Sequence, residues 1–77
     1  MLNLIHQIVN MKRTLEYGWY IHIMLPGEHG TYITSNDKVI PYWEQNYIVI
    51  ERADERTIIP IKKIIMVKLT NKEAMLI

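Results

Sequence analysis

The stretch that decides the fold is TIIPIKKIIMVKL, residues 57–69, in which a proline and two lysines interrupt an apolar run. It is shorter than the ~20 apolar residues that a membrane helix requires, and Pro60 disfavours a helix through its centre. The alternation on either side of the lysines instead predicts two short strands joined by a corner of about one 3₁₀ turn. After this corner we expect three inward side chains, Ile65, Val67 and Leu69.

The amino-acid composition favours a mainly β protein. The 77 residues include fourteen isoleucines and four valines, against six leucines and two alanines. β-branched side chains suit a pleated, half-buried surface and lose rotamer freedom in helices. The same isoleucine excess is typical of AT-rich genomes, including those of many phages. Turn-forming residues at 25–30, 35–37, 44–46 and 52–56 are spaced as in a small barrel or sandwich.

The segments between these turns are read as strands, whereas the N-terminal segment allows two interpretations. Strands are expected at residues 17–25, 31–34, 38–43 and 47–51. Residues 4–15 place apolar side chains on one helical stripe, and Asn3 would cap such a helix. The same segment also alternates as a strand from Leu2 to Ile8. We favour a short helix, with the strand as the alternative.

The strand, Ile-Pro-Ile-Lys-Lys-Ile-Ile corner and strand of residues 57–69 resemble the end of SH3-like and Sm-like barrels, where a 3₁₀ turn leads into a closing strand. One helix followed by about five antiparallel strands also resembles the Sm-like arrangement. The resemblance implies a small antiparallel β-barrel of about five strands with one short N-terminal helix. The length of the chain indicates a single domain over residues 1–77. It implies no binding residues, because Asn36-Asp37 reverses the Asp-Asn signature of Sm proteins.

The predicted strands carry more apolar surface than a chain of this length is expected to hide. Both faces of residues 17–25 and 58–67 are apolar, and so small a domain has a marginal core. We therefore expect a homo-oligomer in which another copy covers the excess. The net charge of +1 argues against an acidic mimic of DNA and against dependence on non-specific phosphate contacts. No secretion signal or membrane segment is recognised, so we expect a cytoplasmic protein without membrane association.

Two groups of residues are candidates for ligand binding. The aromatic group comprises Tyr42, Trp43 and Tyr47, around a polar turn. Such side chains would stack on a base or nucleoside, although Trp43 also suits a core or a subunit interface. The basic group comprises Arg52, Arg56, Lys62 and Lys63. It would bind an anion where an oligomer brings copies together, and the alternative for the two arginines is local pairing with acidic residues at 51–55.

Metal and catalytic chemistry have little support in the sequence. His6, His22 and His29 lie in different predicted elements at irregular spacing, so we expect no metal site. Glu28 and His29, between two glycines, are expected to form a polar hairpin turn rather than an acid–base pair. Without cysteines there is no disulfide and no thiolate metal site. With no catalytic triad or cofactor loop either, we expect neither an enzyme nor a cofactor.

These observations lead us to expect a non-enzymatic, oligomeric binding protein for a nucleotide-like anion. The ligand would be a small nucleotide held at subunit boundaries, as in phage counter-defence proteins, or single-stranded nucleic acid. The alternative is a protein-interaction module, or an inhibitor, that binds a host protein through an exposed strand edge or apolar patch.

Overall fold

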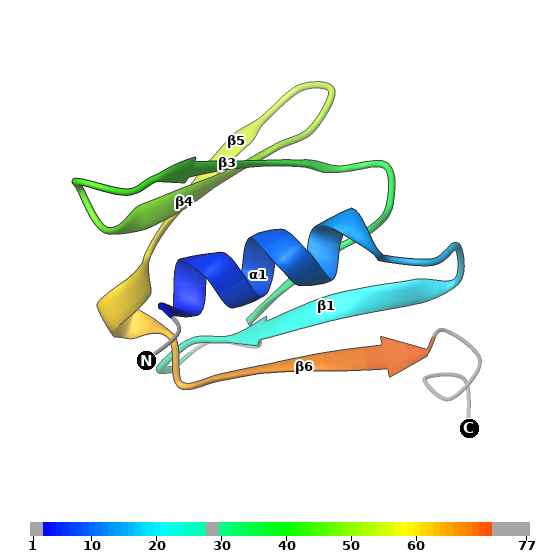
Figure 1. Ribbon diagram of the computed structural model, residues 1–77, viewed down its shortest axis with the longest axis horizontal. Coiled ribbons are helices and arrows are strands. Elements are labelled where there is room, and N and C mark those ends of the chain that lie inside the picture. The colour runs from blue at the N-terminus through cyan, green and yellow to red at the C-terminus, as the bar shows by residue number, and fades with distance from the viewer. Residues whose placement is uncertain (1–2, 28–29, 72–77) are drawn as a thin grey trace.

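The chain forms one short helix and six strands over the residues that the structure describes. This structure is a computed structural model, and it describes residues 3–27 and 30–71. Figure 1 shows the elements, which in chain order are α1 (Leu4–Arg13), β1 (Trp19–Met24), β2 (Thr31–Ile33), β3 (Lys38–Tyr42), β4 (Tyr47–Glu51), β5 (Arg56–Pro60), the 3₁₀ turn η1 (Ile61–Lys63) and β6 (Met66–Asn71). The mainly β fold with one short N-terminal helix is confirmed.

The strands form two antiparallel sheets instead of one closed barrel. Their orders are β2-β1-β6 and β3-β4-β5, and the chain passes between them at residues 34–37 and 61–65. The first of these passages is a turn in which the Asp37 carboxylate accepts a hydrogen bond from the Thr34 N–H at 2.9 Å. This turn separates β2 from β3, where the sequence places a turn at residues 35–37, and the chain has six strands where about five were expected. Over the described ranges β5 pairs only with β4, and β6 only with β1, so the predicted barrel closure is not formed.

The N-terminal segment is helical, as favoured over the strand alternative. The Asn3 side chain accepts a hydrogen bond from the Ile5 N–H at 2.8 Å and so caps the first turn. Lys12 and Arg13 occupy the last turn, where cations interact favourably with the helix dipole. The helix ends at Thr14, whose hydroxyl donates to the Asn10 carbonyl oxygen at 3.2 Å.

A core of isoleucine joins the helix to both sheets. Its buried members among the described residues are Ile5 and Ile8 from α1, Ile21, Ile23 and Ile33 from β1 and β2, and Ile48, Ile50 and Ile59 from β4 and β5. Burying each such side chain stabilises the fold by roughly 1.5–3 kcal/mol before chain entropy is counted. Because the helical isoleucines pack against both sheets, the sheets diverge around α1, as Figure 1 shows, instead of meeting edge to edge.

The predicted corner is present and is hydrogen-bonded to both sheets. The Ile61 N–H donates to the Asn46 carbonyl oxygen at 3.0 Å, and the Ile65 N–H donates to the Met24 carbonyl oxygen at 2.9 Å. The turn η1 follows Pro60 directly. The corner therefore fixes the position of one sheet relative to the other.

The predicted inward direction after the corner is right for one of the three residues. Val67 is half-buried against the core, whereas Ile65 is 63% exposed and Leu69 is 50% exposed. Leu69 pairs with the fully buried Ile21 across the sheet. Since α1 packs over β1 and leaves the edge strand β6 at the rim, sharing a face with Ile21 does not bury Leu69.

Gly30 has a backbone conformation that favours glycine, and the surrounding residues leave no room for a side chain at this position. Its φ is +87°, and an added Cβ would collide with the Ile23 carbonyl oxygen and lie 3.0 Å from Nε2 of His22. Gly27 also has a positive φ, +69°, but an added Cβ there would have no atom within 4 Å. The two glycines therefore separate backbone strain from steric collision.

Gly30→Ala is expected to lower the free energy of unfolding by more than about 3 kcal/mol, because left-handed strain adds to a collision with backbone. Gly27→Ala, with the strain alone, is expected to lower it by about 1–2 kcal/mol. Urea unfolding followed by circular dichroism measures both. Equal losses in the two variants would contradict the close approach at Gly30.

Candidate functional site

The seven predicted site residues separate toward the two ends of β4. The ladder pair Tyr42–Tyr47 closes one end, beside the turn at residues 43–46. The pair Glu51–Arg56 closes the other end, beside the loop at residues 52–55. Five strand residues span ~17 Å, so the aromatic group and the two arginines do not meet within one chain.

The aromatic group divides further between the two faces of the sheet. The rings of Tyr42 and Tyr47 stack on one another, with centroids 4.9 Å apart and planes 26° apart. The ring of Trp43 instead lies 4.4 Å from the ring of His6, on α1, with planes tilted by 41°. Trp43 is 46% exposed, so it is not the fully buried core residue that the sequence allowed.

Lys62 and Lys63 belong to the same end of the molecule as Trp43. Both lie in η1 and are exposed. The hydrogen bond from the Ile61 N–H to the Asn46 carbonyl oxygen, 3.0 Å long, attaches η1 to the aromatic turn. Within residues 3–27 and 30–71, no ion pair involves either lysine. We call Trp43, His6, Lys62 and Lys63 the turn end.

Arg52 is held in place by partners from three segments. Its guanidinium donates to Asp37 at 3.2 Å, to Glu55 at 3.2 Å and to the Tyr32 carbonyl oxygen. Burial alone would lower the pKa of Arg52, but the hydrogen bonds and charges of Asp37 and Glu55 outweigh it, so the pKa is raised above its ordinary value. This arginine links the β4–β5 loop to the turn between β2 and β3. Its arrangement suits a structural role.

Both arginines pair with acidic residues at 51–55, which was the alternative to ligand binding, and Arg52 also pairs with the more distant Asp37. Arg56 pairs with Glu51 at 3.1 Å, and Arg52 pairs with Glu55. Sequence reasoning missed the contact between Arg52 and Asp37, because these residues are fifteen positions apart and are brought together by the register of β3 and β4, in which Lys38 lies opposite Glu51. Arg56 is 74% exposed and so retains most of its contact with water.

One face of the β3-β4-β5 sheet points away from the isoleucine core, and we call it the outer face. The ladder arranges it in three rows: Lys38, Glu51 and Arg56; Ile40, Val49 and Ile58; Tyr42, Tyr47 and Pro60. Seven of these nine residues line a shallow hollow of about 210 Å³, which confirms that they share a face. The outer face therefore has a charged row, an aliphatic row and an aromatic row. The sequence signalled the apolar excess of these strands but not the rows.

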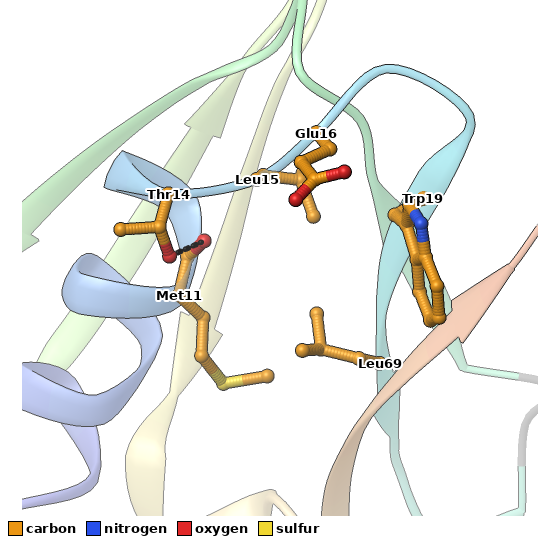
Figure 2. Close-up of a pocket in the computed structure, with 6 residues that line it drawn as sticks. All are labelled: Met11, Thr14, Leu15, Glu16, Trp19 and Leu69. Carbon is orange, nitrogen blue, oxygen red and sulfur yellow. Dashed lines mark hydrogen bonds between the residues drawn. The ribbon is translucent and has the colours of Figure 1, made fainter.

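A second hollow lies where α1 ends beside β1 and β6. Figure 2 shows its lining, which is Met11, Thr14, Leu15, Glu16, Trp19 and Leu69, around a volume of about 230 Å³. Apolar side chains make up most of the wall, and the Thr14 hydroxyl is engaged with the Asn10 and Met11 carbonyl oxygens. No acid–base pair or anion cradle is formed by these six residues. The hollow was not predicted from the sequence.

The remaining candidates give no further site over the described ranges. No three His, Asp or Glu side chains among residues 3–27 and 30–71 come together as metal ligands. Glu28 and His29, the candidate hairpin turn, lie outside the described residues. In the part of the chain that the structure covers, no helix has the length and apolar character needed to cross a membrane. Comparison with known proteins finds no matching family model, curated protein or solved structure.

Arg52→Ala is expected to lower the free energy of unfolding by about 1–3 kcal/mol, because it leaves the nearly buried Asp37 carboxylate, 10% exposed, without its cation. Arg56→Ala is the matched control and should change the same quantity by less than about 0.5 kcal/mol, since its ion pair faces water. Urea unfolding compares them. A loss at Arg56 equal to that at Arg52 would show that Arg52 does not link the loop to the turn.

Proposed function

We propose that this protein is a non-enzymatic, homo-oligomeric binding protein that takes a nucleotide-like anion at the turn end. The ligand is a planar base carrying phosphate, either as a small nucleotide or within single-stranded nucleic acid. The observation that carries this proposal is an exposed tryptophan at the same end as two exposed lysines that form no ion pair with any described residue.

Trp43 supplies the stacking surface. Its ring is held at 4.4 Å by the His6 ring, so one contact orients it while 46% of the residue stays in contact with solvent. Stacking of a base on such a ring contributes about 1–3 kcal/mol and tolerates any base, since every base has a π face. This end therefore favours a nucleobase without selecting among sequences.

Lys62 and Lys63 supply the charge. Their position in η1 is fixed by the Ile61–Asn46 hydrogen bond and by the Ile65–Met24 hydrogen bond. Two phosphate contacts give a moderate affinity that falls as salt rises. These side chains can stack on a base and attract a phosphate, so we propose binding without catalysis at the turn end.

The homo-oligomer accounts for part of the apolar surface that the described chain leaves in contact with water. Ile58 on β5 is 61% exposed. Isolated apolar side chains are normal on surfaces, but Ile58 belongs to the aliphatic row of the outer face. Covering that row with another copy removes it from water.

A second candidate function is binding of a host protein along the edge strand β5. A groove of about 470 Å³ follows this edge and is lined by Leu25, Pro26, residues 57–60 and Lys63. Within the described ranges β5 has one ladder partner, β4, so its other side is open to an added strand. The groove along β5 could therefore take an extended segment of a host protein.

The turn-end proposal is tested by tryptophan fluorescence in a Trp19→Phe variant, in which Trp43 is the one remaining tryptophan. Titration with oligothymidylate, and separately with nucleoside monophosphates, is expected to quench Trp43. For the oligonucleotide, the affinity should fall about 7-fold between 50 and 200 mM salt if two phosphates are contacted. The two titrations distinguish a strand from a free nucleotide.

The paired lysines are tested against a lysine elsewhere. Lys62→Ala with Lys63→Ala should remove most of the salt dependence, whereas Lys68→Ala, an exposed lysine on β6, should leave binding unchanged. Absence of quenching by either ligand, or equal effects of the two lysine changes, would contradict the proposal. Binding of a β-strand peptide without any fluorescence change would instead favour the groove along β5.

A further inference from the structure

We infer that the outer face of the β3-β4-β5 sheet is where two copies of this chain dock, about a two-fold axis that runs along the aliphatic row. This inference deepens the proposed homo-oligomer and rests on it. It also assigns Arg56 of one copy to the aromatic row of the other.

The aliphatic row is the apolar centre of the outer face. Val49, in the middle strand, is only 7% exposed, whereas Ile58 on the edge strand is 61% exposed. A charged row lies on one side of it and an aromatic row on the other. Apolar residues in the centre with tyrosine and arginine around them are the composition of a protein interface.

A two-fold axis in the plane of the interface can run along the strands or across them. With the axis along the strands, each row meets the same row of the partner. Lys38 then faces Arg56 of the partner subunit, and Glu51 faces Glu51 of the partner subunit. Both contacts bring like charges together, which opposes docking.

With the axis across the strands, along the aliphatic row, the charged row meets the aromatic row. Lys38 then lies over the partner's Tyr42, a cation on an aromatic ring. Glu51 faces the phenol of the partner's Tyr47, which can donate a hydrogen bond to the carboxylate. No like charges meet, so of these two orientations this is the one in which the face is complementary to itself.

The same orientation changes what lies at the turn end. Arg56 of one copy comes opposite the partner's Pro60, the residue before η1. It thereby approaches the end that carries Lys62 and Lys63 of the other copy. Cations gathered in this way repel one another until an anion enters, so anion binding and docking should strengthen each other. Arg56 thus comes to the partner's turn end on the outer side of the sheet, whereas Trp43 packs against His6 on the helix side.

The size of the outer face limits the strength of docking. Three strands about 4.8 Å apart and five residues long give a footprint of about 14 Å by 17 Å. This is well below the ~800 Å² per partner of a standard stable interface, so we expect a dissociation constant in the micromolar range or weaker. Dilution should therefore separate the two copies.

Sedimentation equilibrium tests the docking surface with a matched pair of variants. Ile58→Asp and Ile65→Asp change the same residue type at nearly equal exposure, 61% and 63%, one on β5 and the other in the connection that leads into β6. The wild type and Ile65→Asp should approach dimeric mass as concentration rises, and Ile58→Asp should stay monomeric. Circular dichroism checks that both variants fold. Unchanged dimerisation in Ile58→Asp, or equal loss in Ile65→Asp, would overturn the docking surface.

The direction of the axis is tested by Lys38→Glu. Across the strands, this change removes the contact of Lys38 with the partner's Tyr42 and should weaken the dimer about 2- to 5-fold. Along the strands, it would relieve repulsion from Arg56 of the partner subunit and strengthen the dimer. A stronger dimer would therefore overturn the proposed axis.

Oligothymidylate added to the sedimentation experiment tests the shared site. It should tighten the dimer of the wild type but not that of Arg56→Ala. Equal tightening in both would overturn the role of Arg56 while leaving the docking surface in place. A dimer that forms as expected, in a protein that does not quench with any ligand, would refute the ligand proposal and support the docking surface.

Discussion

The fold depends on an interior in which one helix and two sheets share the same isoleucines. A ten-residue helix is marginal in isolation, and a three-stranded sheet needs a partner for its apolar face. Ile5 and Ile8 fill the space between the sheets, so each element buries its apolar side only against the other two. The Asn3 cap and the link between Arg52 and Asp37 act at the edges of this interior, fixing where the helix begins and where the chain changes sheet.

Local chemistry predicted the elements well but not their closure. Pro60 and the two lysines after it marked the corner, and Asn3 marked the start of the helix, because these effects depend on neighbours in the chain. Barrel closure depends on where α1 packs, which no periodicity in the sequence states. The prediction that Leu69 is buried was wrong for the same reason. Alternation indicates which face of the sheet a side chain lies on, but not whether another element covers that face.

The sequence predicted which types of residue form the candidate site, but only partly where in the fold they lie. The aromatic turn and the lysines of the corner come together because a hydrogen bond joins η1 to the turn, which the sequence did not reveal. Arg52 was predicted to bind a ligand or pair locally, and it also reaches Asp37, fifteen residues away. The three rows of the outer face follow from strand register, which the turns set and the composition only hints at through its apolar excess.

Native-state hydrogen exchange tests the shared interior most directly. If α1, β1 and β4 depend on one core, the slowest amides near Ile8, Ile21 and Ile50 should open with the same free energy, equal to that of global unfolding. Exchange in α1 at a clearly lower free energy than in the two sheets would mean that the sheets remain folded when the helix unfolds. That result would contradict the account.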